Sequence, residues 1–194
     1  MKKLLLSVVL ITVVFSAAGS QGLYLDAGLG FGFPFTKIDG ENASSYFDST
    51  VSNFGMEIGL KAGYGPIANI PLYLAGTLSF MDHTLSAGSD ELNFFSCIFG
   101  AGAIFYPIPL VQLAASVGYS YVLNDSTFIS NMYDGDGFAF DFSAAVDLGR
   151  GKHGILLGAR YTASFNVLDV SKAKQNQSLI SIFARYAFRR KISR

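Results

Sequence analysis

The feature that most restricts the fold is an alternation of apolar residues with small or polar ones, which recurs along most of the chain. In residues 23–33, Leu25 and Leu29 fall on one face of an extended segment, and Asp26 and Gly30 fall on the other. A period of two residues is typical of a β-strand, because successive side chains point to opposite faces. No helical periodicity of comparable length is visible. The sequence therefore predicts an all-β fold.

Eight segments carry this alternation, and Gly, Pro, Asn, Asp and Ser residues separate them, as in strands joined by turns. Each apolar stripe extends over about 10 residues, the length with which a strand crosses a membrane as part of a barrel. Closing an even number of such strands into a barrel pairs every backbone N–H and C=O group. The expected strands are 23–33, 53–64, 72–81, 92–106, 110–121, 138–148, 154–167 and 178–188.

The fourth of these segments is ambiguous. Phe94 and Ile98 fall on one face of segment 92–106, and Phe95 and Phe99 fall on the other. Both faces are therefore apolar, and the sequence leaves the register of this strand open.

Composition separates a membrane barrel from a soluble one. Charged residues make up 14% of the chain and hydrophobic residues 51%, whereas about 25% of an ordinary soluble domain is charged. In a soluble barrel such as a lipocalin, the apolar face points inward and the other face meets water. That other face is here mostly Gly, Ala, Ser and Thr, which suits a narrow lumen better. We therefore predict an eight-stranded antiparallel up-and-down transmembrane β-barrel.

The formal net charge is +0, and no basic patch is visible in the sequence. Nucleic-acid-binding proteins carry such a patch. We therefore expect no nucleic-acid partner.

The connections between the expected strands alternate in length, and this predicts the orientation of the barrel. Outer-membrane barrels have short periplasmic turns and longer extracellular loops. We therefore expect both termini in the periplasm of a Gram-negative-type bacterium and the long, acidic connections at the cell surface. The short connections are 65–71, 107–109 and 149–153, and the long ones are 34–52, 82–91, 122–137 and 168–177.

The N-terminal residues predict export. Lys2 and Lys3 precede an apolar run, and small residues follow it. The run of about 15 residues is shorter than the roughly 20 of a membrane-spanning helix, which disfavours an N-terminal anchor. We expect a signal peptide at 1–20, cleaved near 18–20, and one barrel domain at 21–194. The domain ends in a basic tail that contains Arg189, Arg190, Lys191 and Arg194.

Charged residues are also found on the face opposite the apolar stripe, and these are the candidate site residues. The lumen of an eight-stranded barrel is just wide enough for side chains to fill, and buried charges persist only when they are paired. We expect a salt-bridged network that plugs the lumen, with an open path or gate as the alternative. Strand direction places Lys61 towards the periplasmic end and Asp141 towards the outer end. The predicted network consists of Asp26, Glu57, Lys61, Asp141, Asp147, Arg160 and Arg185.

No motif points to an enzyme, a cofactor or a metal. The glycines at 28–32 share one strand face, and no helix follows them, so a nucleotide-binding loop is not expected. His83 and His153 lie in expected connections, where we predict solvated side chains. Neither has the partners of a hydrolytic triad or the ligand spacing of a metal site.

Residues 182–188 look like the aromatic C-terminal strand signal of outer-membrane proteins, with Tyr186 and Phe188 at alternate positions. With the signal peptide, strand count, loop alternation and lumen charges, the mature chain resembles the small eight-stranded outer-membrane proteins. That family includes OmpX, the OmpA barrel domain and OmpW. The resemblance implies outer-membrane lipid and the barrel-assembly machinery as partners. In the family the aromatic residue usually ends the chain, whereas six residues follow Phe188 here.

The resemblance admits three classes of function. The first is a structural or surface-interaction (adhesin-like) protein with a largely plugged lumen, which contacts a host or cell-surface ligand through its loops. Tyr46 and Phe47 in loop 34–52 are the candidate contacts, and deleting this loop is expected to abolish binding without affecting folding. The second is a narrow porin or a conduit for small hydrophobic molecules. The third is a lipid-modifying enzyme, for which the sequence offers no catalytic residues. We expect the first class.

Overall fold

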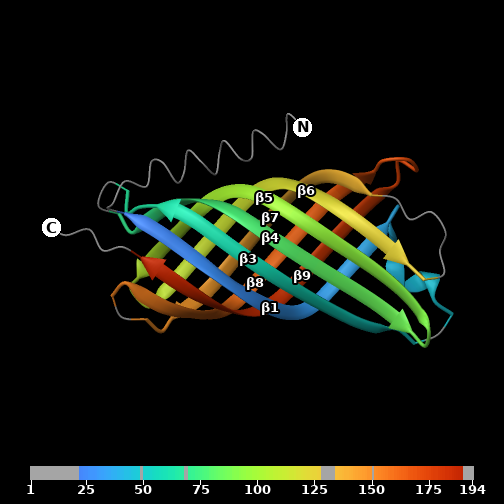
Figure 1. Cartoon of the computed structure of the whole chain (residues 1–194), viewed down its shortest axis with the longest axis horizontal. Helices are drawn as coiled ribbons and strands as arrows, with labels where there is room; N and C mark the ends of the chain where they lie inside the picture. The colour runs from blue at the N-terminus through green and yellow to red at the C-terminus, as the bar shows by residue number, and fades with distance from the viewer. Residues whose placement is uncertain (1–21, 49, 68–69, 128–133, 150, 190–194) are drawn as a thin grey trace.

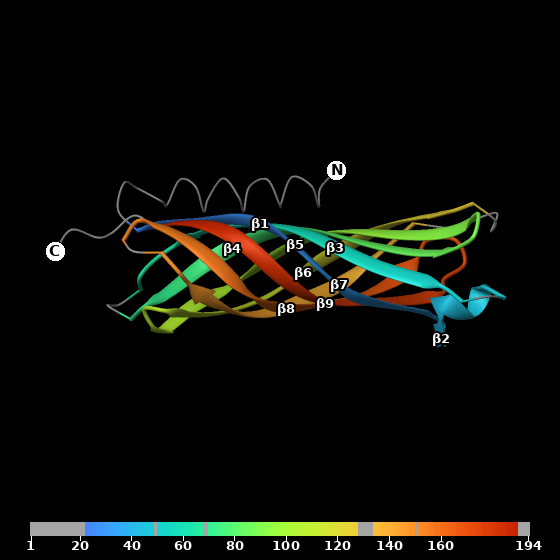
Figure 2. The same cartoon turned by 90° about the horizontal axis from the view of Figure 1, so that it is seen from below.

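The computed structural model describes residues 22–48, 50–67, 70–127, 134–149 and 151–189. Eight long antiparallel strands form a barrel, and they are tilted relative to its long axis (Figures 1 and 2). A two-residue strand and one turn of 3₁₀ helix follow the first long strand. The bounds are β1 Leu23–Ile38, β2 Glu41–Asn42, η1 Ala43–Tyr46, β3 Ser52–Tyr64, β4 Leu72–Ala87, β5 Asp90–Ile108, β6 Val111–Ser126, β7 Gly135–Asp147, β8 His153–Leu168 and β9 Lys174–Arg189.

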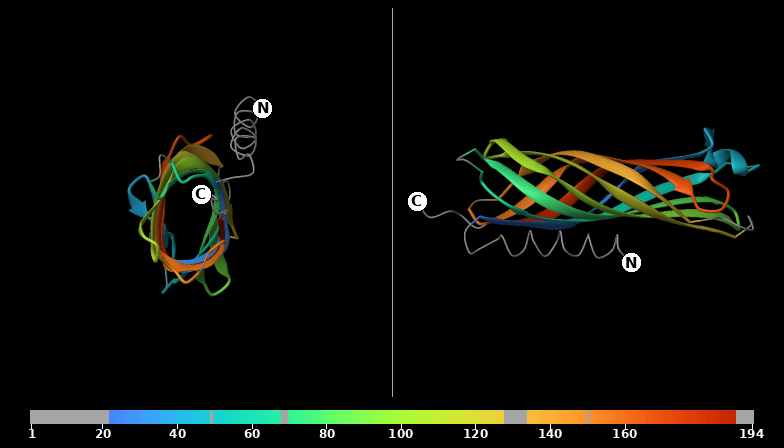
Figure 3. Two further views of the ribbon diagram at one scale, coloured as in Figure 1. Left: turned by 90° about the vertical axis from the view of Figure 1, so that its left-hand side faces the viewer. Right: turned by 90° about the horizontal axis from the view of Figure 1, so that it is seen from above.

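The pairing of the first long strand with the last closes the sheet. Each long strand pairs with its neighbours in sequence, and β1 also pairs with β9, from Tyr24 opposite Arg189 to Ile38 opposite Gln175. Figure 3 shows the resulting ring of strands end-on. The prediction of a closed, eight-stranded, up-and-down barrel is confirmed. Because Tyr24 and Arg189 are paired, the strand ends nearest the two chain termini lie at the same end of the barrel.

Side chains alternate between the lumen and the outer surface. On β9, Ile180 and Ile182 are 51% and 75% exposed, whereas Ser181 between them is 1% exposed. On β1, Phe33 is 74% exposed, and Thr36 is buried. A belt of large apolar side chains on the outside would be unfavourable in water and is stable in hydrocarbon. The protein is therefore a transmembrane β-barrel, and a soluble barrel with an apolar interior is excluded.

The strands extend further than predicted at the end remote from the termini. β4 continues to Ala87 and β5 starts at Asp90, so most of the predicted connection 82–91 is strand. The predicted connections 122–137 and 168–177 are shortened in the same way. The predicted lengths of these three loops are wrong.

The reason is a change in polarity along the strand. Beyond the lipid-facing stripe of β4, Asp82 and Thr84 point outward, and the buried residues Met81 and Leu85 point inward. The alternation therefore continues, but the outside becomes polar and the inside apolar. The apolar stripe of each strand ends at the edge of the membrane, although backbone pairing continues past it.

The structure fixes the register of the ambiguous fourth segment. Phe94 and Ile98 on β5 are buried and face the lumen, with Ser96 between them. Phe95 and Phe99 face outward, and Phe95 stacks on Phe80 of β4 at a ring separation of 5.9 Å.

Among the described residues, no helix is long and apolar enough to span a membrane. The predicted signal peptide at 1–20 lies outside the described residues.

The lipid-facing surface generates a testable prediction. Val117 lies on the outward face of β6 and is 58% exposed. Val117→Lys should lower the free energy of unfolding by about 2–4 kcal/mol, because a charge on the lipid face near the bilayer midplane is poorly solvated. Thr84→Lys, beyond the apolar belt, should cost about 0–1 kcal/mol. Urea unfolding in lipid vesicles, followed by circular dichroism, measures both. Equal losses for the two variants would contradict the placement of Val117 within the membrane and of Thr84 beyond its edge.

Candidate functional site

The structure places all seven sequence-predicted charged residues inside the barrel. Each is at most 4% exposed, and they come from five different strands: β1, β3, β7, β8 and β9. They are the inward-facing members of the alternation, so neighbouring strands aim them into one narrow lumen. The seven are Asp26, Glu57, Lys61, Asp141, Asp147, Arg160 and Arg185.

Arg160 is the centre of this group. Its guanidinium lies 3.2 Å from a carboxylate oxygen of Glu57 and 3.1 Å from one of Asp141. It also donates a hydrogen bond to Ser79 Oγ at 2.9 Å. Lys61 Nζ lies 3.6 Å from Asp141, and Arg185 lies 3.3 Å from Glu57. Cations and carboxylates therefore alternate across the lumen, in the order Lys61, Asp141, Arg160, Glu57 and Arg185.

The predicted separation of Lys61 and Asp141 along the barrel axis is wrong. The two were assigned to opposite ends from their positions along their strands, yet they form an ion pair. The strands are inclined to the barrel axis, so residues at different distances from the strand ends lie at the same height. Position along a strand is therefore a poor measure of depth in the lumen.

A second group of buried residues, which the sequence analysis did not single out, extends this network towards the termini. Tyr24 donates to Asp26 at 2.8 Å, and Gln112 Nε2 donates to the hydroxyls of Tyr24 and Tyr106, both at 2.7 Å. Tyr106 in turn donates to Asp147 at 3.2 Å. With Arg185 3.8 Å from Asp26, polar contacts run without a break from Lys61 to Asp147.

Arg189 closes this end of the network. Its guanidinium lies 2.6 Å from Asp147 and stacks 5.2 Å from the ring centre of Tyr106. Arg189 was expected in the basic tail. This prediction is wrong, because β9 extends through Arg189. The alternation that makes Arg185 and Ala187 face inward continues to Arg189, and this signal could have identified it.

His83 is also placed differently from its prediction. It was expected in a solvated loop, but it lies on β4, is 2% exposed and faces the lumen. Its Nδ1 lies 2.5 Å from Thr36 Oγ1, and its Nε2 lies 2.9 Å from Asn53 Oδ1. Its ring also packs on Phe94 at 5.5 Å. Both ring nitrogens have partners, so His83 is a structural element of the outer lumen. His153 is exposed, as expected, and hydrogen-bonds the hydroxyl of Tyr186.

Beyond His83, apolar side chains form a buried cluster at the end remote from the termini. Buried Leu85, Leu92 and Phe94 form one cluster with Ala43 of η1, and Ile38, Phe47 and Val51 pack against it. Part of loop 34–52 therefore packs on buried residues of β4 and β5 at this rim, and we call the cluster the cap.

The two candidate contact residues in this loop differ in their environments. Phe47 packs against the buried cap, so it is only partly available to a partner. Tyr46 is 40% exposed. Burial, together with the charges of Glu41 and Asp39, raises the pKa of the Tyr46 hydroxyl, which therefore remains neutral.

The aromatic residues of the predicted assembly signal lie on the lipid side of β9. Tyr186 is exposed, and Phe188 is half-buried with its ring 5.4 Å from that of His153. The structure contains no assembly partner, so recognition of Tyr186 and Phe188 stays a prediction.

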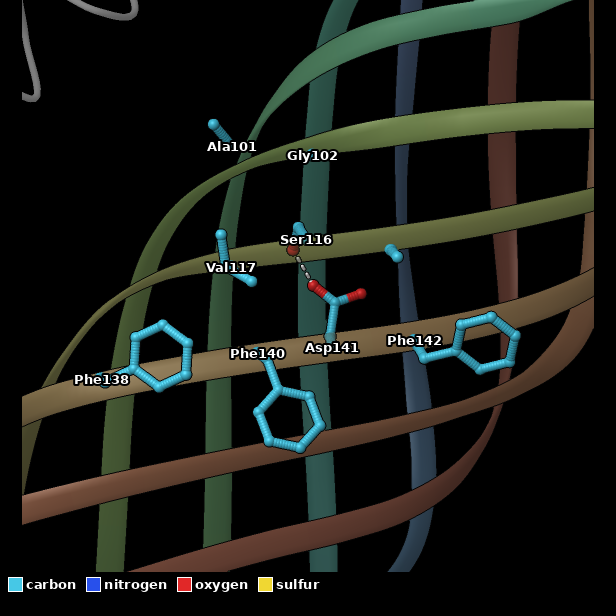
Figure 4. A pocket seen from close by; sticks show the side chains of 9 residues that line it. Ala101, Gly102, Ser116, Val117, Phe138, Phe140, Asp141 and Phe142 are labelled. Carbon is cyan, nitrogen blue, oxygen red and sulfur yellow. Dashed lines mark hydrogen bonds between the residues drawn. The ribbon is translucent and has the colours of Figure 1, made fainter.

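The outer surface carries one notable open groove, with a volume of about 510 Å³, over β5, β6 and β7 (Figure 4). On the inner side of this wall, Gly102 and Gly118 lie so close to neighbouring strands that an added Cβ would be 2.1 Å from a carbonyl oxygen. The groove is lined by Ala101, Gly102, Ala115, Ser116, Val117, Phe138, Phe140, Asp141 and Phe142.

A closed eight-stranded sheet with an apolar exterior and a charge-paired interior is the architecture of the small outer-membrane β-barrel proteins. The fold of this chain is of that kind.

Solved structures of two proteins share this fold. Ail, the attachment invasion locus protein of Yersinia pestis, matches with a TM-score of 0.52 and 13% identity over 85% of this chain and 99% of Ail. Ail in complex with the heparin analogue sucrose octasulfate matches with a TM-score of 0.52 and 15% identity, with the same coverage. Neisserial surface protein A matches with a TM-score of 0.52 and 17% identity over 87% of this chain and 97% of that protein. At these identities the likeness establishes the fold. No protein-family model and no curated protein matches the sequence.

The central ion pairs generate the second prediction. Arg160→Ala leaves Glu57 and Asp141 short of a buried counter-charge and should lower the free energy of unfolding by about 3–5 kcal/mol. Lys152→Ala, in an exposed turn, is the matched control and should have little effect. Thermal unfolding, read from the heat-modifiable mobility of the barrel in gels, ranks the two variants. An unchanged transition for Arg160→Ala would show that the network contributes nothing to stability.

Proposed function

We propose that the protein is an outer-membrane surface-interaction protein, in which a plugged barrel supports a binding surface at its loop end. The observation that carries this proposal is the ion-paired network across the lumen, whose central side chains are 1–3% exposed. Side chains that are paired with one another fill the space a solute would need. A rigid plug makes the barrel a support, and the functional surface is then outside the membrane.

The loop end carries an excess of negative charge, which attracts a cationic partner. Carboxylates outnumber amines on the described part of this end, so a positively charged partner is attracted and a polyanion is repelled. Ail was solved with a sulfated heparin analogue, and we propose a different partner class here. The carboxylates are Asp39, Glu41, Asp48, Asp90, Glu91, Asp125, Asp134, Asp136 and Asp169, and the amines are Lys37, Lys172 and Lys174.

This function requires a defined orientation, which we also propose. A signal peptide at 1–20 directs export, both termini remain in the periplasm, and the acidic end faces outward. The longest connection between long strands, residues 39–51, lies at the end remote from the termini and supports this orientation, because outer-membrane barrels have short periplasmic turns and longer extracellular loops. The aromatic residues Tyr186 and Phe188 would serve recognition by the assembly machinery.

We assign no enzymatic activity. His83 is held by Thr36 and Asn53, and His153 contacts Tyr186. Neither arrangement pairs a nucleophile with a base and an orienting acid.

The plugged lumen is tested by single-channel recording on the refolded protein in planar bilayers. We expect no discrete conductance, because the charged side chains are paired with one another across the lumen. Reproducible conductance steps that change in Lys61→Ala would contradict the plug and would favour the alternative, a narrow porin or a conduit for small hydrophobic molecules.

The surface function is tested with vesicles that display the folded barrel to cultured epithelial cells. Deleting the whole of loop 34–52 is unsuitable, because β1 extends through Ile38 and Ala43 is part of the cap. Point variants avoid this problem. Tyr46→Ala and Glu41→Lys should each lower binding several-fold, whereas Lys152→Glu at the opposite end should not.

Heparin is the second arm of this experiment. We expect heparin not to compete with cell binding, because heparin and the loop end of the barrel both carry negative charge. Competition by heparin, or binding that is insensitive to Tyr46→Ala and Glu41→Lys, would overturn the proposed surface.

A further inference from the structure

Outward of the ion pairs, the lumen changes from charged to neutral polar. Ser120, Ser164, Asn166 and Gln177 are each at most 2% exposed and face inward from β6, β8 and β9. On β6, Ser120 lies four residues beyond Ser116, whose hydroxyl donates a hydrogen bond to Asp141. We call these four residues the neutral chamber.

The register brings the four residues together. Ser120 is opposite Gly137 of β7, and Gly137 is opposite Asn166, so the three lie in one row across adjacent strands. A Cβ on Gly137 would be 1.9 Å from the carbonyl oxygen of Phe165, so this position accepts only glycine. β7 therefore has no side chain between Ser120 and Asn166.

The other side of the chamber is formed by the next pair of strands. Ser164 is opposite Gln177, and Asn166 Nδ2 donates to Ser164 Oγ at 3.1 Å. Gln177 accepts a hydrogen bond from Ser96 Oγ of β5, on the opposite wall. The walls are therefore close enough here for side chains of β5 and β9 to touch.

The chamber is bounded on both sides along the barrel. Towards the loop end, Asn124 and Gln175 exchange two amide hydrogen bonds of 2.7 and 3.0 Å across the lumen. Towards the termini, Thr162 contacts Glu57 at 3.4 Å, where the charged network begins. The four residues between these boundaries are all uncharged.

Three polar atoms of this lining lack a partner within the described part of the chain. They are Ser120 Oγ, Asn166 Oδ1 and Gln177 Nε2. A buried polar atom without a hydrogen bond is strongly unfavourable, and ordered water usually satisfies such atoms. Gln177 Nε2 must donate and Asn166 Oδ1 must accept, so an occupant has to do both.

We propose that the neutral chamber is a binding site for small uncharged hydroxyl-bearing molecules, either water or a small polyol. A hydroxyl group donates and accepts, which matches the unpaired amide and hydroxyl groups. An ion is disfavoured because the chamber offers no counter-charge, and the charges further in are paired with one another. The proposal does not depend on the function of the loops.

Nuclear magnetic resonance of the ¹⁵N-labelled barrel in micelles tests the proposal. The side-chain amide of Gln177 should show cross-peaks to long-lived water if water is the occupant. If a polyol is the occupant, titration with glycerol should shift that resonance in a saturable way. Gln112 is the matched control, because its buried amide already donates to Tyr24 and Tyr106. A Gln177 amide that behaves like that of Gln112 in both arms would refute the site.

A substitution provides an independent test. In a dry chamber, Asn166→Leu would remove an unsatisfied acceptor and raise the thermal midpoint. In an occupied chamber, it removes a partner of the bound molecule, so the midpoint should not rise and the Gln177 signal should weaken. A raised midpoint would overturn the proposal. Ser120→Ala, a smaller change, gives the same comparison if Asn166→Leu does not fold.

Discussion

The constraint on which the rest of the structure depends is that hydrocarbon offers no hydrogen-bond partner to the backbone. An open sheet in a membrane would leave the edge groups of its first and last strands unsatisfied. The pairing of β1 with β9, from Tyr24 to Ile38, removes both edges. Closure with eight strands then determines how the strands tilt and how wide the lumen is.

The narrow lumen in turn determines what the inward side chains can do. Side chains from opposite walls touch, as Gln177 does with Ser96. Arg160 shows the consequence, since it contacts Glu57 and Asp141 from β3 and β7 while it is itself on β8. Interactions of this kind connect strands that are not neighbours in the sheet. The ion pairs therefore add cross-links between walls that backbone pairing alone does not provide.

Much of this architecture could be predicted from the sequence, and the errors in strand extent have one physical origin. The strands within the membrane and the inward position of Arg160 or Glu57 follow from a period of two residues. The extents of β4 and β5, and with them the burial of His83, were mispredicted because the two faces exchange polarity where the barrel leaves the lipid. Arg189 was missed for a related reason, since the end of an apolar stripe was taken as the end of the strand.

The sequence by itself determined that the chain forms strands, which residues share a face, and that the apolar face meets lipid. These properties depend on local alternation and composition. Only the tertiary structure decided which inward residues meet, such as Lys61 with Asp141, because strand tilt and barrel closure set the height of each side chain. It also decided that Ser120 and Asn166 lie in one row with Gly137 between them, since the register of adjacent strands sets which inward residues are neighbours.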